Sequence, residues 1–264
     1  MNLLPAIIFG SFVGLSLGLT GGGGSILAVP LLIYGLGMDV RTAVAVSLVV
    51  VGLTALFGAV LQARSGQVLW GAGLFLGIGG ITFAPLGARI GAILPDDVTI
   101  ALFAVIMIVV GGQMVLGSMA TEVPTGRFAC PSDEQGKPLP TLKCRVRLLT
   151  AGALTGVLSG TFGVGGGFLL VPALLLVTNI RIEQALATSL VAIALTAASG
   201  FTANVAGAAG APVAVTLVFA GGSAVGMSIG AKVKGRLSPR LLRRLFAVIV
   251  VGLGVYMVIR TVIG

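Results

Sequence analysis

Long stretches without a charged side chain limit what this chain can fold into. Such stretches lie between Arg41 and Arg64, Asp97 and Glu122, and Arg147 and Arg181, and the longest lies between Glu183 and Lys232. A helix needs roughly 20 apolar residues to cross a bilayer, and a charge at the bilayer centre costs several kcal/mol. Because only 9% of the residues are charged and 57% are hydrophobic, a soluble domain of this size could not cover its surface. The sequence predicts an all-α integral membrane protein.

An internal duplication divides the chain into two halves. Residues 14–58 align without gaps on residues 156–200, and more than a third of the aligned positions are identical, including Pro30 and Pro172. Self-similarity at a fixed offset indicates repeated structural units. We therefore expect a first transmembrane repeat over 1–119, a cytoplasmic linker over 120–145 and a second transmembrane repeat over 146–264.

Glycine, proline and charged residues break each repeat into about five helical segments. The expected segments are 3–19, 25–36, 41–62, 68–90 and 97–119 in the first repeat, and 146–161, 167–178, 182–205, 211–233 and 239–262 in the second. The second segment of each repeat is too short to span the hydrocarbon, so it is a broken helix or half of a re-entrant hairpin. Either way each repeat crosses the membrane an odd number of times, which predicts two inverted-topology repeats.

The basic residues give the expected orientation. If the linker is cytoplasmic, 13 of the 16 Lys and Arg residues lie inside, and only Arg41, Arg89 and Arg260 lie outside. The positive-inside rule selects this orientation, with both termini periplasmic and the first segment retained as a helix. The same rule explains the net charge of +9. Because no aromatic residues are interleaved with the basic ones, nucleic acid is not an expected partner.

The remaining chemistry of the sequence is sparse. Cys130 and Cys144 both fall in the linker, where a reducing cytoplasm would keep them as free thiols, with a regulatory disulfide as the alternative. Two cysteines and no histidine cannot complete a typical zinc site. We expect no metal, no cofactor and no catalytic residue, and therefore no enzyme. The absence of acidic residues within the spans leaves the coupling ion undetermined.

Two glycine-rich turns at equivalent positions are the candidate substrate site. Unwound backbone inside a membrane is tolerated where protein or water satisfies its polar groups, and the N-termini of the short helices that follow favour anions. Hydroxyls of Ser159 and of the matched Ser47 and Ser189 could also donate to an oxyanion, or only bond the carbonyl one turn back. The predicted substrate-binding residues are Thr20, Gly21, Gly22, Gly23, Gly24, Ser25, Ser47, Thr161, Gly163, Gly165, Gly166, Gly167 and Ser189. Close helix packing is the alternative for glycine, and the better interpretation for scattered ones such as Gly10, Gly52 and Gly252.

The glycine motifs also carry a family resemblance. The pattern Gly18-x-x-Gly-Gly-Gly-Gly with Pro30, and its mate from Gly160 with Pro172, resemble the TauE/SafE family of sulfite exporters and organosulfonate permeases. The resemblance covers the chain apart from the linker. It implies a secondary transporter in the bacterial inner membrane, with membrane lipid around it. The implied substrate is a small anion such as sulfite or sulfoacetate, and the implied direction is export. A passive anion channel and an importer of a related oxyanion such as thiosulfate remain alternatives, and the protein could be a monomer or a homodimer.

Overall fold

The computed structural model describes residues 3–115, 130, 141–178, 180–210, 212–233 and 239–263, so most of the expected linker lies outside the described residues. Every regular element in these ranges is helical, which confirms the all-α fold. The elements are α1 (Leu3–Thr20), η1 (Gly23–Leu27), α2 (Ala28–Pro30), η2 (Leu31–Gly35), α3 (Val40–Ala63), α4 (Trp70–Ile93), α5 (Asp96–Val115), α6 (Leu142–Phe162), α7 (Gly167–Val177), α8 (Ile182–Ala203), η3 (Val205–Gly210), α9 (Val213–Val233) and α10 (Pro239–Ile263).

Six of the described helices are long and apolar enough to cross a membrane. They are α1, α3, α4, α5, α8 and α9. Many large apolar side chains are exposed on the outside of the bundle, among them Leu154, Leu217 and Ile93. A soluble protein rarely exposes so much apolar surface, whereas lipid covers it. The structure thus agrees with a multi-pass membrane protein.

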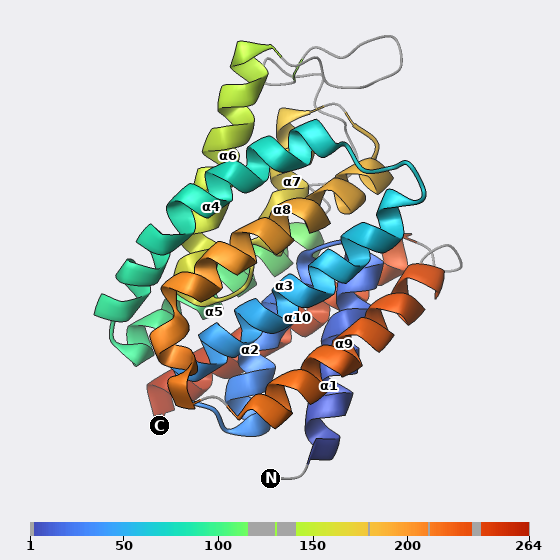
Figure 1. Cartoon of the computed structure of the whole chain (residues 1–264). Coiled ribbons are helices and arrows are strands. Elements are labelled where there is room, and N and C mark those ends of the chain that lie inside the picture. Colours follow the sequence, from blue (N-terminus) through green and yellow to red (C-terminus); the bar gives the residue numbers. More distant parts are fainter. Residues whose placement is uncertain are drawn as a thin grey trace.

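The two repeats are interleaved. Helix α1 packs against α9, and its repeat mate α6 packs against α4, the mate of α9. Helices α3 and α8 are mates that pack against each other, as are α5 and α10. Figure 1 shows the start of α1 and the end of α10 at the lower edge of the bundle, and the start of α6 at the upper edge. Each contact has a counterpart with the repeats exchanged, as a two-fold relation would produce; the inverted orientation itself stays a prediction.

Glycine lets the interleaved helices approach closely. A Cβ on Gly14 of α1 would lie 1.9 Å from the Ser223 carbonyl oxygen of α9, and one on Gly10 would lie 2.3 Å from that of Phe219. Since small residues allow such backbone contact in membranes, the packing interpretation of Gly10 is confirmed. Gly52 also packs, with its Cβ position 3.2 Å from Ala197. For Gly252 the interpretation is wrong, because a Cβ there would meet open space.

The short segment of each repeat folds back as a hairpin. In the second repeat, the Cys130 N–H donates to the carbonyl oxygen of Val177 at 2.8 Å, and Cys130 is also bonded to Cys144 in the first turn of α6. The end of α7 therefore lies beside the start of α6. In the first repeat, Gly35 at the end of η2 packs against Phe9, halfway along α1. These contacts resolve the alternative that the sequence leaves open, in favour of hairpins.

The cysteines correct one expectation. Cys130 and Cys144 form a disulfide, with their Cα atoms 5.3 Å apart, so the prediction of free thiols is wrong. Helix α6 begins earlier than expected because Thr141 caps it, accepting a hydrogen bond from the Cys144 N–H at 3.4 Å. This cap winds Cys144, which is buried, into the first turn next to Cys130. The expectation of free thiols came from the cytoplasmic location alone, whereas the disulfide forms because the hairpin brings the two cysteines together.

Candidate functional site

Equivalent turns end α1 and α6. Gly21 and Gly163 have left-handed φ angles of 71° and 72°. The Gly21 N–H donates to the Leu17 carbonyl at 2.7 Å, and the Gly163 N–H donates to that of Ser159 at 2.8 Å. A glycine in this conformation is a common helix terminator because it has no Cβ. Both repeats therefore stop their first helix in the same way and reverse the chain inside the bundle.

The two turns touch each other. A Cβ built on Gly22 would lie 2.6 Å from the Gly167 carbonyl oxygen, and one built on Gly167 would lie 2.6 Å from that of Gly22. No side chain separates the two backbones at this point. Segments 145 residues apart in the sequence thus form a single cluster, as the candidate site requires.

Two serines join each turn to the other repeat. The Ser47 Oγ donates to the Gly163 carbonyl at 2.5 Å, and the Ser189 Oγ donates to the Gly21 carbonyl at 2.8 Å. Both serines are fully buried. Each hydroxyl also lies within 2.9 Å of the carbonyl oxygen three residues before it. The structure thus brings both predicted serines to the site, where their hydroxyls hold the turns in place.

The first turn uses its hydroxyls to bond its own backbone. The Thr20 Oγ1 donates to the Ser16 carbonyl at 2.7 Å and accepts from the Gly24 N–H at 3.1 Å. The Ser25 Oγ donates to the Gly22 carbonyl at 2.8 Å. The chain continues as a short 3-10 turn in η1 and then as the irregular α2 and η2. The predicted hydroxyls of this turn therefore close it locally.

The second turn is more open in its hydrogen bonding. Gly165 and Gly166 both have a left-handed φ of 67°, and no side chain caps α7. In the described part of the chain, no hydrogen bond uses the N–H groups of Val164, Gly165 or Gly166. Thr161, although predicted as a ligand, donates away from the turn to the carbonyls of Val157 and Gly87. The free donors here are backbone N–H groups.

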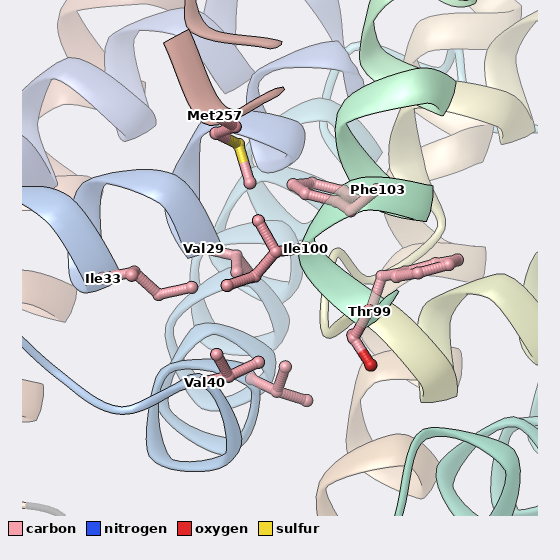
Figure 2. A pocket seen from close by; sticks show the side chains of 9 residues that line it. Val29, Ile33, Val40, Thr99, Ile100, Phe103 and Met257 are labelled. Carbon is pink, nitrogen blue, oxygen red and sulfur yellow. The ribbon is translucent and has the colours of Figure 1, made fainter. Parts of the chain in front are cut away.

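An apolar pocket opens beside the second turn. Its volume is only about 10 Å³, roughly the space of one water molecule, and its lining is Val29, Ile33, Val40, Val44, Thr99, Ile100, Phe103, Phe162 and Met257. These side chains come from α2, η2, α3, α5, α6 and α10, and Figure 2 shows them converging. Phe162 directly precedes Gly163 and stacks on Phe103, with ring centroids 5.6 Å apart. The sequence reasoning missed this pocket, although Phe103 and its repeat mate Phe246 were a visible signal.

The site has no charged side chain of its own. All buried polar side chains among the described residues are serine or threonine. A search of the same residues finds no group of three or more His, Cys, Asp or Glu that could hold a metal ion. Positive potential at the turns must therefore come from peptide N–H groups and helix N-termini. Such a site can bind an anion through hydrogen bonds and release it without breaking an ion pair.

Comparisons with known proteins agree on one family. The family model described as "Sulfite exporter TauE/SafE" matches residues 6–257. A "Probable membrane transporter protein" of Xylella fastidiosa strain 9a5c is 33% identical over 98% of this chain and 96% of its own length. "Probable membrane transporter protein YjnA" of Bacillus subtilis is 29% identical over 96% of this chain and 98% of its own. "Probable membrane transporter protein MJ0441" of Methanocaldococcus jannaschii is 27% identical over 97% and 96%. No solved structure matches the chain.

Proposed function

This chain belongs to the TauE/SafE sulfite exporter family of membrane transporters, and from that premise we propose that it exports a small sulfur-containing anion. The proposed substrates are sulfite, sulfoacetate or a related organosulfonate, and the proposed location is the bacterial inner membrane. The two glycine turns form the binding site, and the protein works by alternating access around it. Most of the proposal depends on one observation, the direct contact of the two turns at Gly22 and Gly167.

The chemistry of the cluster suits an oxyanion. Backbone N–H groups and hydroxyls donate hydrogen bonds, and an anion with several oxygens accepts them from several directions. The N-terminus of α7 adds a partial positive charge. Buried carboxylates, which would repel the substrate, are absent from the described residues. An uncharged site also spares the cost of holding a fixed cation in a low-dielectric interior.

A difference between the repeats supports alternating access. Phe103 lines the pocket beside the second turn. Its mate Phe246 instead packs against the first turn, where a Cβ on Gly23 would lie 3.2 Å from its ring. The equivalent helices α5 and α10 thus pack differently against the two turns within one conformation of the protein. In transporters built from inverted repeats, exchange of such arrangements moves access from one side to the other.

The orientation is proposed from the charge distribution, with the termini periplasmic and the linker cytoplasmic. The Cys130–Cys144 disulfide favours the opposite side, because disulfides persist in oxidising compartments. We give more weight to the 13 basic residues against 3, since a single disulfide can form reversibly. Reporter fusions at the C-terminus and at residue 120 test this: periplasmic reporter activity at residue 120 would contradict it.

Isothermal titration calorimetry with sulfite, thiosulfate, sulfoacetate and chloride tests the site. We expect at least one sulfur oxyanion to bind the purified protein, and Gly165→Ala to abolish binding because the new Cβ would lie 2.7 Å from Val51. Gly37→Ala is the matched control: this glycine is also left-handed, but its Cβ position meets nothing within 4 Å. Unchanged binding in a folded Gly165→Ala variant would place the site elsewhere.

A passive anion channel and an importer of thiosulfate are the competing functions. Proteoliposomes distinguish them. A carrier gives saturable counterflow of labelled anion against an excess of unlabelled anion, whereas a channel gives ohmic currents and no counterflow. Coupled uptake of thiosulfate into right-side-out membrane vesicles would favour import over export.

A further inference from the structure

Ser159 in α6 carries a polar group that the rest of the protein does not use. Its hydroxyl is fully buried, and it is the one buried side-chain nitrogen or oxygen among the described residues without a hydrogen-bond partner. Buried polar groups are almost always paired, so an unpaired one is a candidate contact for a ligand. The position of this hydroxyl in the fold shows what the ligand would contact.

Ser159 lies against the second glycine turn. Its carbonyl oxygen accepts the hydrogen bond from the Gly163 N–H. One helical turn earlier, the Thr155 carbonyl lies 3.0 Å from the position of a Cβ on Gly166. Residues four apart in a helix share a face, so Thr155 and Ser159 lie on the same side of α6. The buried Ser159 hydroxyl is thus within one helical turn of Gly163, where the second glycine turn begins.

Other unused donors follow Ser159 in the second turn. The N–H groups of Val164, Gly165 and Gly166 donate to no acceptor in the described residues, and the 11-residue helix α7 follows them without a side-chain cap. All residues from Thr161 to Phe168 are buried. A buried hydroxyl, successive backbone N–H groups and a helix N-terminus thus lie close together along the chain between Ser159 and Gly167, and all of them favour a negatively charged oxygen.

The first repeat lacks the unpaired hydroxyl, although the N–H groups of Gly22 and Gly23 also donate to no acceptor in the described residues. The residue equivalent to Ser159 is Leu17, which is fully buried in the apolar core. The first turn also uses the hydroxyls of Thr20 and Ser25 to close its own backbone. The two repeats therefore differ at this position, where only the second has a hydroxyl that could donate to a ligand.

Within the site formed by the two turns, we infer that the second turn supplies the hydrogen bonds to the anion, with the Ser159 hydroxyl and the turn N–H groups donating to one substrate oxygen. This inference rests on the proposed function and assigns the hydrogen bonds of its site to one repeat. The small apolar pocket lies next to this turn, because Phe162 and Val44 line it and also flank Gly163. The first turn is a structural partner that holds the second in place through the contact of Gly22 with Gly167.

Calorimetric titration with sulfite compares the wild type, Ser159→Ala and Ser159→Cys, with Thr155→Val as the control. Thr155 is one turn away and its hydroxyl is already paired with the carbonyls of Ala151 and Gly152. A hydrogen bond to a charged group is worth roughly a 10- to 100-fold change in affinity. We expect a loss of that size for Ser159→Ala, a smaller loss for the weaker thiol donor of Ser159→Cys, and a change of less than about twofold for Thr155→Val.

Thermal unfolding without sulfite gives a second readout. Removal of an unpaired buried hydroxyl should leave stability unchanged or raise it. A clear loss of stability in Ser159→Ala would mean that the hydroxyl is already bonded, for example to a buried water, and would overturn the inference. Wild-type affinity in Ser159→Ala would also overturn it while leaving the proposed function intact. If wild-type protein binds neither sulfite nor the other anions, the proposed function fails and the inference with it.

Discussion

Replacing Ser47 or Ser189 with alanine should loosen the contact between the repeats. Each hydroxyl is fully buried and donates to a glycine carbonyl in the turn of the other repeat. Alanine removes the donor and leaves that carbonyl, at Gly163 or Gly21, buried without it. The two substitutions are equivalent in the duplicated structure, so they should have similar effects.

The size of the effect follows from what is left unpaired. A buried acceptor that loses its donor costs about 1–3 kcal/mol, so each single variant should lose that much unfolding free energy. Thr54→Val is the matched control, because the Thr54 hydroxyl is also buried but donates only to the carbonyl of Val50 in its own helix. That carbonyl keeps its backbone partner, so this variant should lose less than about 1 kcal/mol. Ser65→Ala, at an exposed site, should be neutral.

Unfolding in mixed micelles of mild detergent and SDS, followed by far-UV circular dichroism, measures these differences. The double variant Ser47→Ala, Ser189→Ala should show the sum of the single losses if the two bonds are independent, and a smaller total if one turn has already moved. The reasoning is refuted if both single variants are no less stable than Thr54→Val. A large loss in only one of them would refute the equivalence of the two turns.

Three further predictions concern other parts of the chain. Gly163→Ala should lower the unfolding free energy by about 2–5 kcal/mol in the same assay, because it combines left-handed backbone strain with a Cβ overlap. Gly37→Ala should lower it only by the strain, about 1–2 kcal/mol. Equal losses in the two variants would contradict the packing of the turn. Asp39 caps α3, and the hydrogen bond from the Thr42 backbone N–H lowers the pKa of its carboxyl. The cap therefore stabilises the folded protein fully above the unfolded pKa of about 4, and this contribution is lost as pH falls through the lower folded pKa. Asp39→Ala should therefore cost about 1 kcal/mol at neutral pH and progressively less in acid, and a constant difference across a pH titration would exclude this role. Reduction of the disulfide between Cys130 and Cys144, 14 residues apart, should lower stability by about 2–3 kcal/mol in a comparison of melts with and without reductant; an unchanged melt would show that the bond constrains nothing.

The sequence alone determined the membrane class, the duplicated plan and the places where helices break. Charges are absent wherever a helix must cross lipid, and this constraint acts on each segment independently of its neighbours. The repeat offset paired the turn at Gly21 with that at Gly163, and both adopt the left-handed conformation that glycine permits. Local chemistry was sufficient for these features because a helix stop depends on residues close in sequence.

Only the tertiary structure decided which segments meet. The direction in which α7 returns depends on its contact with the start of α6. The contact of Gly22 with Gly167 and the bonds of Ser47 and Ser189 join parts of the chain more than 100 residues apart. A small residue or a hydroxyl in a membrane helix is compatible with many partners, so its type does not identify the one it contacts. The buried, unpaired hydroxyl of Ser159 became visible for the same reason, because a polar group can be recognised as unsatisfied only after all its neighbours are known.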